Sequence, residues 1–433
     1  MGSNNRVLNN ARWIVICRAL QSLVQMVIGM ISARYLGPSD YGLIAYAAAV
    51  VSFAVPIMEL GMSSTLVKEY VADPAREGQT LGTALVMNAL SGLACMVGVA
   101  CFVAIANPGE TETLIVCVLY SITLVTQVPL TIQYWFQAKL QSKYSSIAVL
   151  VAYVFVSVYR IYLLIAKKNV YWFALAHALE YGFAGILLLY FYKTHGAQKI
   201  TVSFARAKEI FRRSRYYIIS ALMVNIYQNT DQIMLKTLVD DSENGFFKTA
   251  LTCTVIVSFV YDAVIESMRP VILSAKKTSQ EAFNIGLSSL YTVMIYMALA
   301  QGIAFTLLAK PIINILYGAE FLPAVPVLQI LVWQVGFSFI GLVRNIWILG
   351  EEKHKALWKI NLGGVITNIC MNAILIPLWG ARGAALASVI TQLFTHVILG
   401  FVIKEIQPNN RLMLQGLNPK NALYLVQKLR KKA

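Results

Sequence analysis

Long apolar blocks separated by short polar segments dominate this chain. Blocks such as 81–106 and 360–379 are each about the ~20 residues that an α-helix needs to cross a ~30 Å hydrocarbon core. A helix of a water-soluble protein instead has an apolar face and a polar face, so apolar and polar residues alternate every few positions along the chain. The pattern therefore predicts an all-α integral membrane protein.

The blocks predict twelve membrane spans. Their approximate ranges are 13–33, 42–62, 81–106, 113–136, 147–166, 170–192, 216–238, 246–268, 287–309, 324–349, 358–379 and 383–404. Short motifs recur in order in the two halves: Val-Ser-Phe at 51–53 and 257–259, and Ala-Leu-Ala at 174–176 and 385–387. We therefore predict two six-helix lobes related by a parallel repeat, an arrangement that places a substrate between the lobes.

Four segments follow from this division. They are an N-terminal lobe at 1–193, a basic linker helix at 194–215, a C-terminal lobe at 216–404 and a basic tail at 405–433.

Composition strengthens the membrane prediction, and charge adds an orientation. Only 13% of the residues are charged, about half of what a soluble domain carries. Of the 36 basic residues, 26 fall in segments on one predicted side of the membrane and seven on the other. By the positive-inside rule both termini are cytoplasmic. The rule also accounts for the net charge of +16 without a nucleic-acid partner.

No catalytic or metal-binding motif stands out. The six cysteines all lie in apolar blocks, and the four histidines form no cluster, so buried thiols are favoured over a metal site. The chain has no phosphate-binding loop, nucleophile elbow or HExxH motif, and its predicted outer loops are short. We expect no enzyme activity and no metal cofactor beyond a monovalent cation.

The linker has the pattern of an amphipathic helix. Phe204, Ala207, Ile210 and Phe211 are predicted to share one face, with the basic residues of 204–215 largely elsewhere. This pattern predicts a helix that lies on anionic lipid, and the basic tail suggests the same partner. A solvated basic linker is the alternative.

Three arginines lie inside apolar blocks and are not explained by orientation: Arg18, Arg160 and Arg344. Gln25 shares the face of Arg18. The planar guanidinium suits phosphate, so these arginines predict a cavity of positive potential. Alternatively, each pairs with a carboxylate from another helix or extends to an interface.

A second polar group combines acids with uncharged oxygen donors. Asp231 lies in the polar stretch 225–232, and Asp262 lies in the eighth span. Pairs at one-turn spacing follow in the last two spans: Asn368 with Asn372, and Ser388 with Thr391. Such groups can bind a proton or Na⁺ and couple transport to an ion gradient. Salt bridges and ordinary interhelical hydrogen bonds are the alternatives.

Several segments carry a resemblance to a known family. Residues 33–46 (ARYLGPSDYGLIAY), 59–66 (ELGMSSTL), 230–235 (TDQIML) and 376–387 (IPLWGARGAALA) resemble bacterial polysaccharide repeat-unit flippases of the Wzx type. These flippases belong to the multidrug/oligosaccharidyl-lipid/polysaccharide (MOP) exporter superfamily. The resemblance extends over nearly the whole chain.

The resemblance implies a MATE-like fold, a lumen between the lobes and a place in the bacterial inner membrane. It implies that an undecaprenyl-pyrophosphate-linked oligosaccharide crosses to the outer leaflet by alternating access. Arg18 and Arg34, then Arg160 and Arg344, match basic lumen positions, with Gln25 beside them. A monomer is expected, working with a polysaccharide polymerase and glycosyltransferases.

The resemblance also implies an ion site. Related lipid II flippases hold Na⁺ between the seventh, eleventh and twelfth helices. By helix position this site maps to Asp231, Asn368, Asn372, Ser388 and Thr391. The carboxylate expected on the eleventh helix is replaced by asparagine. The resemblance therefore does not decide whether the coupling ion is Na⁺ or H⁺.

Three alternatives differ in class from this flippase or in its cargo. A cation-coupled drug antiporter of the same superfamily needs acids in an otherwise neutral cavity, whereas this chain has arginines in its spans. A lipid II-type flippase would carry a different headgroup. An assembly scaffold would need no lumen at all.

Overall fold

The fold is helical, as the apolar blocks predict. The computed structural model describes residues 2–196, 198–353 and 355–418, and among them no strand occurs. The helices of the first half are α1 (Gly2–Met58), α2 (Ser63–Ala72), α3 (Glu77–Ala106), α4 (Thr111–Ser121), α5 (Thr123–Thr126), α6 (Ile132–Ala138), α7 (Ser142–Ile165) and α8 (Val170–His195). Those that follow are α9 (Phe204–Leu238), α10 (Asp241–Thr278), α11 (Gln280–Leu316), α12 (Ala324–Gly350), α13 (Lys355–Leu393), α14 (Leu399–Val402) and α15 (Gln407–Gly416).

The chain is a multi-pass membrane protein. Eight segments of the described residues are long and apolar enough to cross a membrane. Two of them, Leu20–Met58 and Ala356–Val402, have 39 and 47 residues, enough for two passes each at ~20 residues per pass. These eight segments therefore hold ten of the twelve predicted spans. The other two lie in α9 and α10, which are helical but are not among the eight.

Glycine breaks the two double-length segments where the sequence predicts a loop. Gly37 in α1 has φ 74° and ψ 174°, and Gly380 in α13 has φ 54° and ψ −131°. Side chains with a Cβ rarely adopt such angles. At Gly380 an added Cβ would also collide with the carboxylate of Glu243. That carboxylate accepts a hydrogen bond from the Ala381 amide at 2.5 Å, which satisfies one of the free N–H groups where the helix restarts.

The fourth predicted span is interrupted by a proline. Thr111–Ala138 qualifies as one candidate span, but α4, α5 and α6 divide it, with a 3₁₀ turn at Val128–Thr131. Pro129 stands in the first turn of that 3₁₀ segment. Because proline has no N–H to donate, the regular α-helical ladder is broken there.

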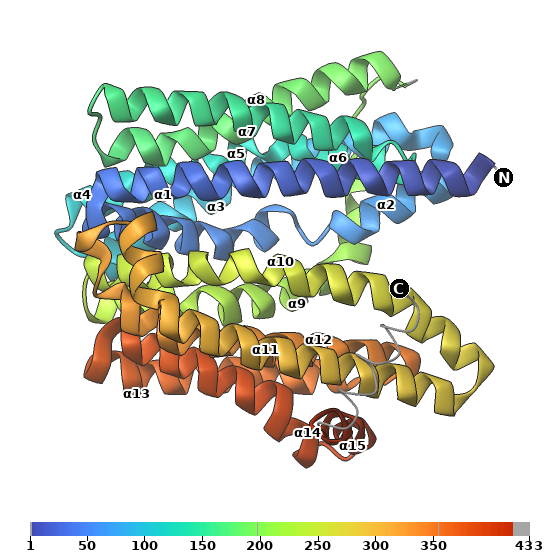
Figure 1. The fold of residues 1–433 in the computed structure, drawn as a ribbon. Coiled ribbons are helices and arrows are strands. Elements are labelled where there is room, and N and C mark those ends of the chain that lie inside the picture. Colours follow the sequence, from blue (N-terminus) through green and yellow to red (C-terminus); the bar gives the residue numbers. More distant parts are fainter. Residues whose placement is uncertain (1, 197, 354, 419–433) are drawn as a thin grey trace. The chain divides into compact units, whose positions relative to one another are not determined.

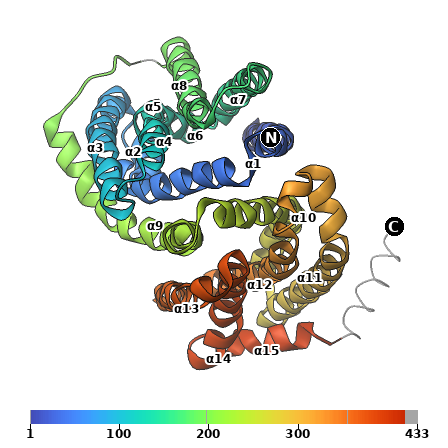
Figure 2. The ribbon, with the colours of Figure 1, turned by 90° about the vertical axis from the view of Figure 1, so that its left-hand side faces the viewer.

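Two compact units make up the protein: Met1–Asn229 and Thr230–Ala433. The change of unit therefore falls within α9, whereas the predicted linker ends at residue 215. Within the first unit α7 and α8 run side by side (Figures 1 and 2). Within the second unit α14 and α15 are neighbours in both views.

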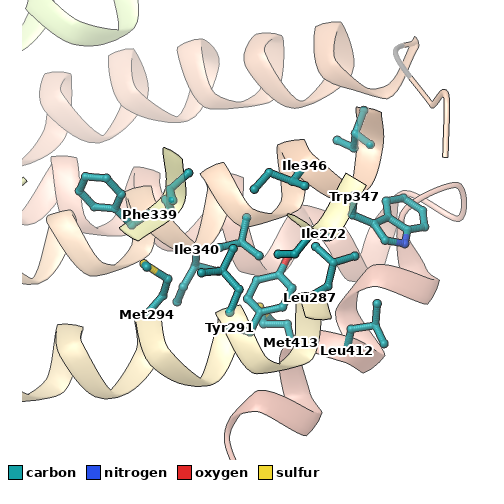
Figure 3. Packing of buried hydrophobic residues seen from close by; sticks show 14 of the residues in the cluster. Ile272, Leu287, Tyr291, Met294, Phe339, Ile340, Ile346, Trp347, Leu412 and Met413 are labelled. Atoms are coloured by element: carbon teal, nitrogen blue, oxygen red, sulfur yellow. The ribbon is translucent and has the colours of Figure 1, made fainter. Parts of the chain in front are cut away.

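Each unit has its own apolar core. In the first unit Leu66 of α2, Phe136 of α6 and Ile210 of α9 belong to one fully buried cluster. In the second unit α10, α11, α12 and α15 contribute to another cluster, in which Tyr291 lies beside Met413 (Figure 3). Inclusion of Ile210 in the first core explains why the start of α9 belongs to the first unit.

Candidate functional site

A buried polar cluster in the second unit is built around the carboxylate of Asp231. The Asn368 side-chain amide donates to Asp231 Oδ1 at 2.9 Å, and Asn372 donates to the same oxygen. The Ser388 hydroxyl donates to Asp231 Oδ2 at 2.5 Å. All four side chains are buried. The structure thus brings together four of the five residues mapped to the ion site.

The backbone of α13 explains this convergence. Asn368 and Asn372 are one turn apart and therefore share a face of the first half of α13. The break at Gly380 lets the second half restart in another direction, and Ser388 lies on that half. Asp231 lies on α9, seven residues before the helix ends at Leu238.

The two remaining candidates behave differently. Thr391 is buried, but its hydroxyl donates to the Ala387 carbonyl at 2.7 Å. It lies one turn beyond Ser388, on the same side of the helix. Asp262 of α10 is exposed, and no contact of the described residues joins it to Asp231.

The cluster has the chemistry of a small cation or proton site. Three side chains donate hydrogen bonds to one carboxylate. The amide oxygen of Asn372 is buried and has no hydrogen-bond partner among the described residues. Hard cations prefer carboxylate, amide and hydroxyl oxygens as ligands.

Arg160 is held inside the first unit. Its guanidinium on α7 forms an ion pair with Glu180 of α8 at 3.5 Å. It also donates to the Tyr153 hydroxyl at 3.4 Å and lies 3.3 Å from both ring nitrogens of His177. The structure therefore pairs Arg160 with a carboxylate from another helix, one of the two arrangements that the sequence left open.

Arg344 is held inside the second unit. It lies on α12 and is only 2% exposed. It donates to the Thr395 carbonyl at 2.7 Å and contacts His396 Nδ1 at 3.1 Å. Both partners belong to a π-helical turn at Phe394–Ile398, and such turns shift backbone carbonyls out of the regular helical ladder.

The candidates on α1 do not share this burial. Arg34 and Gln25 of α1 are exposed, and Arg34 makes no ion pair or hydrogen bond among the described residues. Arg18 lies outside the residues whose side chains are described. Among the described arginines predicted to bind substrate, Arg34 is thus the accessible one.

Sequence reasoning missed the partners that hold the two buried arginines. Glu180 and His396 were not predicted as site residues. A histidine or a glutamate in an otherwise apolar span was the available signal. Which arginine each would meet depends on how helices far apart in sequence pack together.

Comparison with known proteins shows to which family the chain belongs. The sequence profile of the family described as polysaccharide biosynthesis protein matches residues 7–276, well over half of the chain. This chain belongs to the polysaccharide biosynthesis protein family. The resemblance to a polysaccharide biosynthesis family is thereby confirmed.

Two curated relatives agree with the family assignment. The probable low-salt glycan biosynthesis flippase Agl15 of Haloferax volcanii is 24% identical over 213 residues. That match covers 47% of this chain and 45% of the relative, so the chain spans about half the length of that protein. The capsular polysaccharide biosynthesis protein CapF of Staphylococcus aureus is 21% identical, with 92% of this chain and 100% of the relative covered.

Solved structures confirm the fold that this family member was predicted to have. A lipid II flippase MurJ in an inward closed conformation matches with a TM-score of 0.74 at 14% identity, covering 95% of this chain and 92% of that one. An inward-facing multidrug resistance MATE transporter of the MOP superfamily matches with a TM-score of 0.67 at 14% identity, covering 92% and 96%. The chain therefore has the MOP fold.

Proposed function

We propose that this polysaccharide biosynthesis family member is a flippase for a lipid-linked oligosaccharide. It moves an undecaprenyl-pyrophosphate-linked repeat unit from the cytoplasmic to the outer leaflet by alternating access. The observation that carries the proposal is the coincidence of two matches on one chain. The chain matches the polysaccharide biosynthesis family over 7–276, and its fold is that of a lipid II flippase.

The relatives narrow the cargo to a glycan. One is described as a probable glycan biosynthesis flippase and the other as a capsular polysaccharide biosynthesis protein. A lipid-linked repeat unit is the form in which such a glycan crosses a membrane before polymerisation. In this proposal the protein sits in the bacterial inner membrane with both termini cytoplasmic. It works as a monomer beside a polymerase and glycosyltransferases.

The arginines have two separate roles in this proposal. Arg34, together with Arg18, binds the pyrophosphate, because Arg34 is exposed and makes no ion pair among the described residues. Arg160 and Arg344 are engaged by Glu180 and by the Thr395 carbonyl. They therefore serve first to hold helices together within each unit. Gln25, exposed on the same helix as Arg34, adds a hydrogen bond to the pyrophosphate or to the glycan.

Ion coupling is assigned to the cluster around Asp231. Its carboxylate, with oxygens from Asn368, Asn372, Ser388 and Thr391, is proposed to bind either Na⁺ or a proton. The unpartnered amide oxygen of Asn372 supports a cation, and the missing second carboxylate supports a site of low charge. Asp262 is exposed and is left outside this site.

The substrate role is tested by replacing Arg34. Arg34→Ala is expected to lower surface-polysaccharide export about 10- to 100-fold, because a charge-assisted hydrogen bond contributes about 1.5–3 kcal/mol. Arg34→Lys should restore export only in part, since lysine lacks the bidentate fork. Export is measured in cells that lack the native gene, with membrane abundance checked by immunoblot.

Lys310→Ala is the matched control. Lys310 is also exposed. It follows the ninth predicted span as Arg34 follows the first, so both lie on the same predicted side. This control should export normally. Full export by Arg34→Ala at normal abundance would overturn the pyrophosphate role of this residue.

A further inference from the structure

The start of α9, residues 204–215, has two faces of different character. With 3.6 residues per turn, positions spaced four and three residues apart share a face. Arg206, Ile210 and Arg213 form one such stripe. Phe204, Lys208, Phe211 and Arg215 form another, on the opposite side of the helix. We call this segment the strap.

The first stripe is docked on the first unit by ion pairs. Arg206 contacts Glu69 of α2 at 2.9 Å and Glu209 at 2.8 Å, and it donates to the Thr80 hydroxyl at 3.1 Å. Arg213 contacts Glu209 at 2.7 Å and also pairs with Glu69. The hydrogen bond from Arg206, with the nearby charges of Arg213 and Arg212, lowers the pKa of Glu209. Glu209 therefore stays ionised at neutral pH.

The residues before the strap are fixed as well. The side chain of Gln198 accepts from the Gly78 amide at 3.0 Å and donates to the Pro74 carbonyl at 2.9 Å. The Ser203 amide donates to the Thr83 hydroxyl at 3.1 Å. Gly78 and Gly82 leave no room for a side chain beside this segment. The strap is thus an integral part of the first unit.

This docking corrects the predicted helix face. Phe204, Ala207, Ile210 and Phe211 were expected to lie together, with the basic residues elsewhere. Instead Ile210 is fully buried in the first core, while Phe204 is 88% exposed and Phe211 is 42% exposed. Arg206 is buried on the docked side. The apolar residues of the strap are therefore divided between its docked face and its exposed face.

The exposed stripe combines aromatic rings with positive charge. Lys208 and Arg215 of this stripe are exposed beside Phe204 and Phe211, and Arg212, next to the stripe on the helix, is exposed as well. Arg215 donates to the hydroxyl of the neighbouring Tyr216 at 2.9 Å. The chain leaves the span formed by α8 at His195 and enters the next predicted span near residue 216. The strap therefore lies at the boundary between bilayer and water.

We propose that this exposed stripe binds the headgroups of anionic phospholipids. Aromatic and basic residues on one face are the combination that holds a helix at an anionic interface. Because the opposite face is fixed to α2 and α3, lipid bound here is bound to the first unit. This surface is separate from the transport site, and its failure would leave the proposed flippase activity standing.

The test measures phospholipid retained by the full-length protein. The protein is placed in nanodiscs of phosphatidylcholine with and without phosphatidylglycerol, and bound lipid is counted by native mass spectrometry. The variant Lys208→Gln/Arg212→Gln/Arg215→Gln is expected to retain at least fivefold less phosphatidylglycerol. Each basic residue at a membrane surface contributes up to about fivefold. Phe204→Ser alone should lower retention without altering charge.

The matched control removes the same charge elsewhere. Arg269→Gln/Lys277→Gln/Lys353→Gln changes three exposed basic residues. They follow the eighth and tenth predicted spans as the strap follows the sixth, which places all of them on one predicted side. This variant should retain phosphatidylglycerol like the wild type. Equal losses in both triple variants would contradict a specific surface and indicate only general charge attraction. Retention that depends on the strap for a polyprenyl pyrophosphate but not for phosphatidylglycerol would also overturn the proposal.

Discussion

At the residue scale, the carboxylate of Asp231 holds the buried polar cluster together. Asn368 and Asn372 from one half of α13, and Ser388 from the other half, all donate hydrogen bonds to it. Loss of this one charge should therefore affect the whole cluster.

Asp231→Asn tests the ion site at this scale. The substitution keeps the shape of the side chain but removes its negative charge, so the cation or proton is no longer bound. We expect export to fall at least about tenfold, as for loss of a hydrogen-bonded charge. The remaining export should no longer respond when Na⁺ is replaced by K⁺ or when the proton gradient is collapsed.

Asp262→Asn serves as the comparison, because Asp262 is exposed and has no described contact with Asp231. It should keep wild-type export and wild-type ion dependence. If Asp231→Asn retained the ion dependence of the wild type, the coupling role would have to be assigned to other residues.

The grouping of these residues could be predicted from the sequence. Asn368 and Asn372 stand one turn apart in a span, and this spacing together with the family resemblance was enough to group them with Asp231 and Ser388. Arg160, by contrast, is paired with Glu180 across two helices. Spacing along the chain shows which residues share a helix face, but it does not show which helix lies opposite.

At the scale of elements, the predicted spans agree with the helices because ~20 apolar residues are a strong signal. The strap shows where that signal fails. Its helix was predicted, but its faces were not, because Glu69 and Thr80 decide which side is docked and both lie more than 120 residues earlier. The breaks at Gly37 and Gly380 fall between predicted spans, so glycine at a loop position was informative.

Gly380→Ala tests the second of these breaks. Alanine would have to adopt a left-handed φ and would meet the Glu243 carboxylate. Such strain costs about 1–3 kcal/mol, so the detergent-solubilised variant should unfold at a lower temperature. Gly98→Ala is the control, because no atom lies within 4 Å of its added Cβ and alanine is favoured by up to about 1 kcal/mol inside a helix. Unfolding of both variants at the wild-type temperature or above would contradict a need for glycine at position 380.

At the scale of the whole molecule, composition alone identified a multi-pass membrane protein. The resemblance of a few segments identified its family. The two-lobe plan was predicted from weak internal repeats. The exact change between units was not predicted: the first unit extends into α9 as far as Asn229, beyond the predicted linker. Nothing in the sequence names the sugar of the repeat unit, because glycan specificity depends on side chains brought together by the fold.

The central claim is that this chain moves a lipid-linked oligosaccharide across a bilayer. Its most direct test is a flipping assay with the purified protein in vesicles that contain a fluorescent undecaprenyl-pyrophosphate-linked oligosaccharide. A quencher that cannot cross the membrane reports how much of this lipid reaches the outer leaflet. We predict that the wild-type protein raises the quenched fraction above that of empty vesicles, and that Arg34→Ala slows the rise. An identical quenched fraction with and without folded protein, over a range of imposed Na⁺ and proton gradients, would contradict the account.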